Sequence, residues 1–305
     1  MWTAAARAQA WVPGKGQGSL SLLYMQKQST KLTNADGSFD PFGKVIDRTL
    51  YLTLDYGLTD RLAISAGLPF QSNRYSGNDP HDPRAFPFPN DQRFLDDGHF
   101  HAGWADWSVA LRYQFHPRQF LITPFIGYSR PSHDYTFFAH SALGTQQWAL
   151  QAGVHIGKWF PPPWQNAYWQ LGYAYTFEQS TKHLDQLANQ QLADNRHVNH
   201  GALSLRLGYN FTPRLDGHVL IEHSNSYGNG VNATQDFGNP DGSPNFNNIF
   251  YHDQLLLARY TRASVGLDYQ LNDRYQLSVV YGRTLSAANA HFWDYETTFG
   301  ISRSF

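Results

Sequence analysis

The chain has 305 residues, of which 16% are aromatic and 15% are charged, and its formal net charge is −1. It contains no cysteine, which excludes disulfides, zinc–thiolate sites and haem attachment through a Cys-x-x-Cys-His motif. The mean hydropathy is −0.50, and no run of about 18 apolar residues occurs, so the sequence predicts no transmembrane helix. The near-zero net charge indicates neither a nucleic acid nor another strongly charged partner.

The first ten residues differ from the rest of the chain. Residues 4–10 read AAARAQA and end in an Ala-x-Ala pattern at Ala8 and Ala10, which resembles the cleavage end of a secretory signal with Trp11 as the mature start. The apolar segment expected upstream is missing, and an ordinary flexible N-terminus is the alternative. We interpret residues 1–10 as a signal-peptide remnant and residues 11–305 as one domain, because no internal linker interrupts the pattern.

From residue 19 onward, apolar and polar residues alternate in segments separated by turn-forming residues. A period of two predicts β-strands with one apolar and one polar face. The most regular segment is 45–58, in which Leu50, Leu52 and Leu54 alternate with Tyr51 and Thr53. In chain order, the predicted strands are residues 19–28, 45–58, 61–73, 103–115, 119–130, 145–159, 167–179, 197–211, 215–226, 254–271, 275–285 and 292–305.

The last predicted strand, residues 292–305, needs a different environment on each of its two faces. Its apolar face is predicted to carry Trp293, Tyr295, Thr297, Phe299, Ile301 and Phe305. The other face is polar and partly charged, so one side needs an apolar environment and the other needs water. A soluble β protein can place the apolar face in a core, whereas a transmembrane barrel turns it toward lipid. A terminal strand that ends in an aromatic residue resembles the closing strand of bacterial outer-membrane barrels.

The lengths of the connections favour the barrel. Short connections follow the even-numbered predicted strands at 59–60, 116–118, 161–166, 212–214 and 272–274, and longer polar connections follow most odd-numbered strands. Outer-membrane barrels sort their connections in this way, whereas a soluble sandwich has no reason to. The sequence therefore predicts an all-β protein, a 12-stranded antiparallel transmembrane β-barrel. We expect short periplasmic turns, long extracellular loops, both termini in the periplasm, and a bacterial outer membrane with its lipid and lipopolysaccharide around it.

Charged residues of both signs fall on the predicted lumen face. The candidates for the lumen or its constriction are Asp55, Asp106, Arg112, His155, Glu178, Arg206, His218, Glu222, Arg262, Asp268, Asp294 and Glu296. A charge on the lipid face costs about 2–4 kcal/mol at mid-membrane, so their confinement to one face supports the register. Two interpretations follow: a polar channel with a constriction tuned by facing charges, or a salt-bridged interior that only holds the barrel together.

Two other groups of residues suggest a catalytic or metal site, but less strongly. The sequence Glu222–Ser226 resembles the His-x-Ser-Asn motif of outer-membrane lipid hydrolases, but Ser224 directly follows His223 and must point to the opposite face. An enzyme is therefore not expected, and a lipid hydrolase is the weaker alternative. In the polar loop 78–101, Asp96 and Asp97 with His99 and His101 can ligate a divalent cation, although a solvated outer loop is the simpler explanation. No other cofactor is expected.

Several strand ends resemble a known family. The run Tyr56–Leu62 (YGLTDRL) leading to Gly67–Phe70 (GLPF) is similar to a hairpin of the outer-membrane family labelled MetA-pathway of phenol degradation. Residues 103–115, residues 271–275 (LNDRY) and the final Phe305 fit the same family. The resemblance covers most of the chain with short motifs. It implies a small outer-membrane barrel that passes small solutes, often aromatic or apolar, and it carries over no catalytic residues.

We therefore expect an outer-membrane channel, or porin-like transporter, for small solutes. The alternative is a structural or partner-docking barrel, because related barrels also occur beside multihaem cytochromes.

Overall fold

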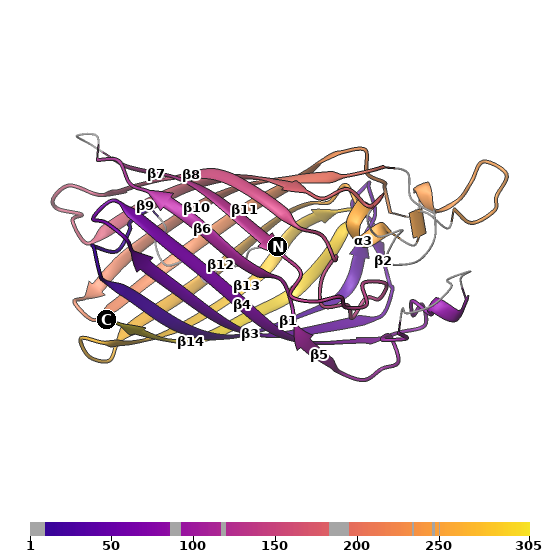
Figure 1. The fold of residues 1–305 in the computed structure, drawn as a ribbon, viewed down its shortest axis with the longest axis horizontal. Coiled ribbons are helices and arrows are strands. Elements are labelled where there is room, and N and C mark those ends of the chain that lie inside the picture. Colours follow the sequence, from indigo (N-terminus) through magenta and orange to yellow (C-terminus); the bar gives the residue numbers. More distant parts are fainter. Residues whose placement is uncertain are drawn as a thin grey trace.

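The structure is a closed barrel of antiparallel strands (Figure 1). It is a computed structural model, and it describes residues 10–85, 93–116, 120–182, 195–233, 235–245, 248–249 and 251–305. Fourteen strands form one sheet, which closes because β14 pairs with β1. Two of them, β2 and β5, are short additions to the rim, so the wall consists of twelve strands, as the alternation predicts.

The wall strands are β1 (Gly18–Thr33), β3 (Lys44–Gly57), β4 (Leu62–Ser76), β6 (Trp107–Tyr113), β7 (Leu121–Arg130), β8 (Ala149–Trp159), β9 (Ala167–Glu178), β10 (Val198–Thr212), β11 (Leu215–Gly228), β12 (Arg259–Gln270), β13 (Tyr275–Ala288) and β14 (Ala290–Ser304). The smaller elements are β2 (Phe39–Asp40), β5 (His101–Trp104), the 3-10 turns Pro83–Ala85 and Gln235–Phe237, and the helical turn α3 (His252–Leu255). Within the described residues, no helix is long and apolar enough to cross a bilayer.

The connections have the predicted asymmetry. The short turns lie at the end of the barrel where the C-terminus lies, and the long loops, α3 and β2 lie at the opposite end (Figure 1). We call these the turn end and the loop end. The exception is the junction of β13 and β14, which are separated only by Asn289 with a φ of 52°; the two strands pair with each other up to Gly282 and Glu296, and beyond that point they pair with β12 and β1. Asparagine tolerates this left-handed conformation better than most residues. Of the predicted turn at 116–118, residues 117–118 lie outside the described residues.

Several predicted strand limits are wrong at the loop end. The predicted strand 254–271 begins only at Arg259, because His252–Leu255 forms α3. The predicted strand 145–159 begins at Ala149, and the predicted strand 103–115 is divided at residues 105–106 into β5 and β6, which both pair with β4. β1 extends five residues beyond its predicted end at Gln28, because Ser29–Thr33 continues the ladder with β14. The extension of β1 and the division of residues 103–115 follow from pairing with β14 and β4, whereas the strand 254–271 is shortened by a local helical turn.

The outer surface of the wall is apolar, and aromatic residues lie toward both rims. Aliphatic side chains such as Leu22, Leu52 and Leu205 are exposed in the middle of their strands. Toward the turn end, the exposed aromatic residues include Tyr113, Tyr209, Phe211, Tyr275 and Phe305, and toward the loop end they include Trp104, Trp107, Trp148 and Phe177. Aromatic belts around an aliphatic band are typical of barrels in a bilayer, where amphipathic rings sit at the headgroup level. The predicted orientation of the strands is therefore confirmed for these residues.

The prediction for Trp293 is wrong. Its side chain lines a small inner cavity and lies under the ammonium group of Lys27, 4.1 Å from the ring centroid. The pairing of β14 with β1 shifts register between Gln28 and Ser29 and again before Lys31. Such β-bulges insert an extra residue and reverse the alternation of faces. Phe299, Ile301 and Phe305, which follow the shift, keep the predicted outward face.

The long loops do not stand free, because they fold over the mouth of the barrel around a hydrophobic cluster. We call this cluster the loop core: Leu32, Phe42, Val45, Tyr75, Phe137, Phe138, Val198, Val231, Ala233, Tyr251, Leu255 and Leu256. Its members come from four wall strands, β1, β3, β4 and β10, and from the connections β1–β3, β7–β8 and β11–β12, so it ties these loops to the wall. Full burial of one such aromatic or aliphatic side chain contributes about 1.5–3 kcal/mol. The loop end is thus a packed cap.

Candidate functional site

The lumen contains a cavity of about 420 Å³ bounded by most of the wall strands. Eight of the twelve predicted lumen residues line it: Asp55, Arg112, His155, Arg206, His218, Glu222, Arg262 and Asp268. Glu296 lines an adjoining space of about 70 Å³. The wall is also partly apolar, because Leu23, Tyr51, Phe125 and Val280 contribute to it. A solute in the cavity can therefore contact both polar groups and aromatic or aliphatic side chains.

One ion pair links two strands of the wall on the side that faces the cavity. The guanidinium of Arg112 on β6 donates to the carboxylate of Asp55 on β3, which also accepts a hydrogen bond from the hydroxyl of Ser65 on β4 at 3.1 Å. The Arg112 side chain is only 7% exposed, whereas Asp55 is 28% exposed to the lumen. The pair leaves no unbalanced charge at this part of the wall.

A second group lies on three neighbouring strands. Arg206 on β10 donates to Nδ1 of His218 on β11 at 2.9 Å and lies 3.6 Å from the Asp268 carboxylate on β12. Because Nδ1 of His218 accepts this hydrogen bond, the imidazole carries its proton on Nε2. Asp216 lies 3.5 Å from the same His218 nitrogen and accepts a hydrogen bond from Tyr168 at 3.1 Å. Two carboxylates and one guanidinium thus meet around a histidine.

A third group is centred on Arg262. Its guanidinium lies 3.1 Å from Glu222 on β11 and 3.3 Å from Glu296 on β14. All three side chains are about one fifth exposed, so they face solvent in the lumen. One cation between two carboxylates leaves a local excess of negative charge, which favours cations at this point of the lumen.

His155 is the least constrained of the predicted lumen residues. Its ring stacks on Phe125 at a centroid distance of 4.9 Å, and Gly172 on the neighbouring strand leaves room for it, because a Cβ there would lie 2.8 Å from Nδ1. Neither ring nitrogen has a hydrogen-bond partner within the described part of the chain. Both nitrogens are also buried, so in this conformation the ring presents no hydrogen-bonding atom to the cavity.

The other three predicted lumen residues lie nearer the loop end. Asp106 accepts a hydrogen bond from Tyr135 at 2.6 Å, and Glu178 lies 3.9 Å from His200. Asp294 sits at the bulged part of β14 and accepts a hydrogen bond from Thr30 at 2.8 Å. The structure does not bring these three into the central cavity.

The segment before β1 also enters the lumen, which sequence reasoning missed. Trp11, Val12 and Pro13 line the cavity. The backbone N–H of Ala10 donates to Gln170 at 2.9 Å, and its carbonyl accepts from Thr123 at 2.7 Å. The indole of Trp11 packs edge-on against Tyr168 and Trp159. Nothing in the local sequence signals this, because the partners lie more than a hundred residues away.

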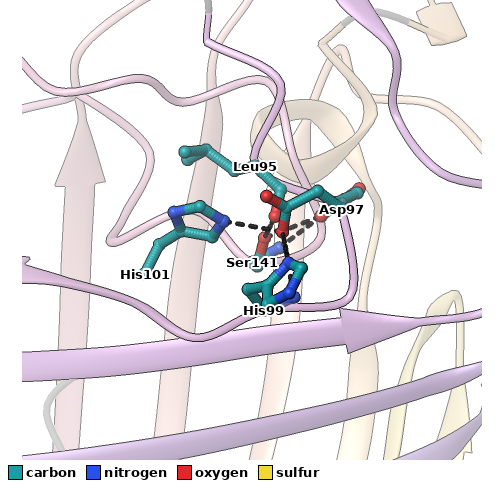
Figure 2. A network of polar contacts seen from close by, with 6 residues as sticks. Leu95, Asp97, His99, His101 and Ser141 are labelled. Carbon is teal, nitrogen blue, oxygen red and sulfur yellow. Dashed lines mark hydrogen bonds and ion pairs between the residues drawn. The ribbon is translucent and has the colours of Figure 1, made fainter.

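The predicted cation ligands of the loop 78–101 separate into two groups. The carboxylate of Asp97 lies 2.8 Å from Nε2 of His101 and 3.4 Å from Nδ1 of His99, and Figure 2 shows the three side chains converging. The hydrogen bond from His101 holds the pKa of Asp97 below its ordinary value. Asp96 does not join them. Its carboxylate is buried and binds the backbone and side chain of Ser141, beside Leu95 in Figure 2.

The hydrolase-like residues stay apart. His223 is exposed on the outer face of β11, where Nδ1 lies 2.9 Å from the hydroxyl of Thr261, and Ser224 is buried on the inner face. The predicted opposite orientation of these two side chains is confirmed.

Known proteins resemble this chain in structure, whereas the sequence comparisons find no match. The sequence matches no protein-family model and no curated protein. An outer-membrane channel from Pseudomonas putida F1 aligns over 99% of this chain and 100% of its own, with a TM-score of 0.73 and 14% identity. The chain has the fold of an outer-membrane β-barrel. The predicted family resemblance stays a prediction at this level of identity.

Two autotransporter domains are more distant neighbours of this outer-membrane barrel. The translocator domain of NalP from Neisseria meningitidis aligns over 96% of this chain and 90% of its own, with a TM-score of 0.52 and 11% identity. The β-domain of the Bordetella autotransporter BrkA aligns over 95% and 100%, with a TM-score of 0.50 and 12% identity. Both show the shared architecture and nothing about the lumen chemistry of this chain.

Proposed function

We propose that this outer-membrane barrel is a channel through which small solutes cross the membrane. The observation that carries the proposal is the cavity of about 420 Å³ inside the barrel, bordered by paired charges on most sides. Its size lies in the range of small-molecule sites. The outer-membrane channel of Pseudomonas putida F1, which aligns over its whole length, supports the same reading.

The lining favours small aromatic compounds that carry a polar group. Phe125 and Tyr51 offer ring contacts, and polar side chains that line the same cavity, such as Gln151 and Ser204, offer hydrogen bonds. Because most lumen charges are paired, long-range repulsion does not exclude either sign of solute. The outer surface would meet lipid and lipopolysaccharide, with both termini in the periplasm.

The test is reconstitution of the refolded full chain. In planar bilayers we expect discrete conductance steps, and in liposomes we expect faster entry of phenol or benzoate than of a disaccharide. A matched pair of variants on β6 links flux to the lumen. Ala110→Trp fills the cavity that Ala110 lines and should abolish flux, whereas Val109→Trp on the opposite face of the strand should not. Folded protein without conductance or solute entry would contradict the proposal.

One observation favours the second candidate, a structural or partner-docking barrel. Residues 10–13 occupy part of the lumen through several hydrogen bonds, as expected if passage were not the purpose. A barrel of this kind would bind a protein partner such as a cytochrome. The two candidates differ in one measurement, because the docking barrel would show no solute entry even after residues 10–13 are displaced.

A further inference from the structure

Three histidines from three different loops meet inside the cap. His81 lies between β4 and β5, His140 between β7 and β8, and His252 on α3. One ring nitrogen of each lies within 4.8 Å of those of the other two. The rings of His81 and His140 stack with centroids 3.9 Å apart, and those of His81 and His252 cross edge-on at 4.7 Å.

Hydrogen bonds to the backbone fix the tautomers of two of these rings. Nε2 of His140 lies 3.2 Å from the carbonyl of Asp79, and Nδ1 of His252 lies 2.7 Å from the carbonyl of Ile249. A carbonyl only accepts, so each of these nitrogens must carry the proton. The lone pairs that remain are on Nδ1 of His140 and Nε2 of His252. Histidines that bind metals are usually oriented in this way, with the other N–H on a carbonyl or carboxylate.

Two ring nitrogens of the cluster are buried without a partner among the described residues, whereas Nε2 of His252 lies 3.3 Å from a carboxylate oxygen of Asp253. Nδ1 of His81 and Nδ1 of His140 have no hydrogen-bond partner within the described residues, and the His81 residue is 9% exposed. A buried polar atom without a partner is destabilising, and a bound ion is one of the standard explanations for it.

The carboxylate of Asp96 binds the backbone of the two stacked histidines. Its carboxylate accepts backbone N–H hydrogen bonds from His81 at 2.9 Å and His140 at 3.0 Å, together with two hydrogen bonds from Ser141. One side chain thus fixes the two loops relative to each other. The residue that the sequence suggested as a cation ligand instead positions two of the histidines.

A second cluster of possible ligands is less suited to a metal. Asp216, His218 and Asp268 also lie within 4.8 Å of one another in the lumen. There, however, Arg206 already donates to Nδ1 of His218 and lies near Asp268. A cation would have to displace a guanidinium. No arginine or lysine is paired with His81, His140 or His252 in the described part of the chain.

We propose that His81, His140 and His252 bind one divalent transition-metal ion of the Zn²⁺ class. Three imidazoles suit Zn²⁺, Cu²⁺ and Ni²⁺, whereas Ca²⁺ and Mg²⁺ require oxygen ligands. Zn–N bonds of about 2.0–2.1 Å place tetrahedral ligands roughly 3.4 Å apart, so on binding the ring nitrogens approach by about an ångström. The stacked rings of His81 and His140 must also turn apart, because an imidazole binds through its in-plane lone pair and both ring planes must then contain the ion. The fourth position is left for water or for Asp253, whose carboxylate lies 3.3 Å from Nε2 of His252.

Binding links the three loops that cover the lumen. The metal adds a bond between the loops 77–100, 131–148 and 229–258, whose described residues meet through packing and hydrogen bonds. Metal binding itself does not depend on the channel function, whereas any effect on solute entry does.

The test uses the refolded full chain in detergent, stripped with a chelator and titrated with Zn²⁺ by calorimetry. We expect one equivalent to bind, and Co²⁺ to give the intense visible absorption of a tetrahedral site. His140→Asn and His252→Asn should each weaken Zn²⁺ binding on the order of 100-fold or more, because even residues that only orient ligands contribute 10–100-fold. Circular dichroism and heat-modifiable migration on gels establish that each variant is a folded barrel.

The control is the double variant His99→Asn/His101→Asn, which removes the two histidines beside Asp97 and should keep full affinity. The proposal is overturned if this control loses the Zn²⁺ and His140→Asn retains it, since the ion would then sit at Asp97. It is also overturned if the wild-type barrel binds no stoichiometric Zn²⁺, or if Co²⁺ shows only the weak absorption of an octahedral ion. If a histidine variant fails to fold, the control still decides the matter, because loss of Zn²⁺ from His99→Asn/His101→Asn would place the ion at Asp97.

Discussion

Arg112 reaches across a whole strand to bind Asp55. The two residues lie on β6 and β3, which are separated in the sheet by β4, and Ser65 on β4 donates to the same carboxylate. Three adjacent strands are thereby tied together on their lumen side. The pair balances two charges at the wall of the cavity, so its removal has consequences for both stability and selectivity.

Replacing Arg112 with alanine should leave the Asp55 carboxylate facing the lumen alone. We expect the reversal potential in a KCl gradient to shift toward cation selectivity, because a fixed negative charge attracts cations. The free energy of unfolding in lipid vesicles should fall by about 1.5–3 kcal/mol, the usual contribution of a hydrogen bond to a charged group. The double variant Asp55→Ala/Arg112→Ala should return the reversal potential to the wild-type value. An unchanged potential in Arg112→Ala would show that this pair does not face the conducting path.

The N-terminal segment should be displaced by a side chain at Gly157. A Cβ at this position would lie 2.7 Å from the Cβ of Ala10 and 2.8 Å from the ring of Trp11. Gly157→Val should therefore push the segment out of the lumen and raise the single-channel conductance. Gly127→Val on β7 is the matched control, because the nearest atoms to a Cβ there are 3.5 Å away and belong to the wall. Equal conductance in wild type and Gly157→Val would mean that the segment does not obstruct the path.

The wall of the barrel was predictable from the sequence because its determinants are local. Leu50, Leu52 and Leu54 repeat every second residue, and each is exposed on the outer face. The face of a side chain in a regular strand depends only on its position along the strand. Trp293 does not follow this rule, because the register of β14 shifts against β1. A bulge of this kind depends on the partner strand, so no pattern within residues 292–305 reveals it.

The partners within the candidate site were not predictable. The alternation indicated that Asp55 and Arg112 share the lumen face, but their meeting depends on the registers of both β3 and β6 with β4. The cluster of His81, His140 and His252 depends on the folding of three loops around the loop core. Asp96 was selected for its neighbours in sequence, whereas its actual partner, Ser141, lies in another loop. Side chains that meet through long-range contacts leave no local signal.

A charge on the lipid face should destabilise the barrel according to its depth. Leu205 lies near the middle of β10, and Phe211 lies one residue before its end at Thr212, both on the exposed face. Leu205→Arg should lower the free energy of unfolding by about 2–4 kcal/mol, and Phe211→Arg, near the interface, by about 0–1 kcal/mol from the charge. Urea unfolding in phosphatidylcholine vesicles, followed by tryptophan fluorescence, measures both. Similar losses for the two variants would contradict the placement of the membrane band around the middle of the strands.

Asp96→Asn should loosen the cap without affecting the wall. The wild-type carboxylate accepts four hydrogen bonds from His81, His140 and Ser141, and an amide must turn its NH₂ group toward some of these donors. Burial raises the pKa of Asp96, so part of the lost bonding is offset by removing a buried charge. We expect faster proteolysis in loops 77–100 and 131–148, a roughly 10–100-fold weaker affinity for Zn²⁺, and unchanged circular dichroism of the barrel. Asp97→Asn, next in the chain but exposed with His99 and His101, should leave both proteolysis of the cap and Zn²⁺ affinity close to wild type. If the two variants behave alike, Asp96 does not hold the two loops together.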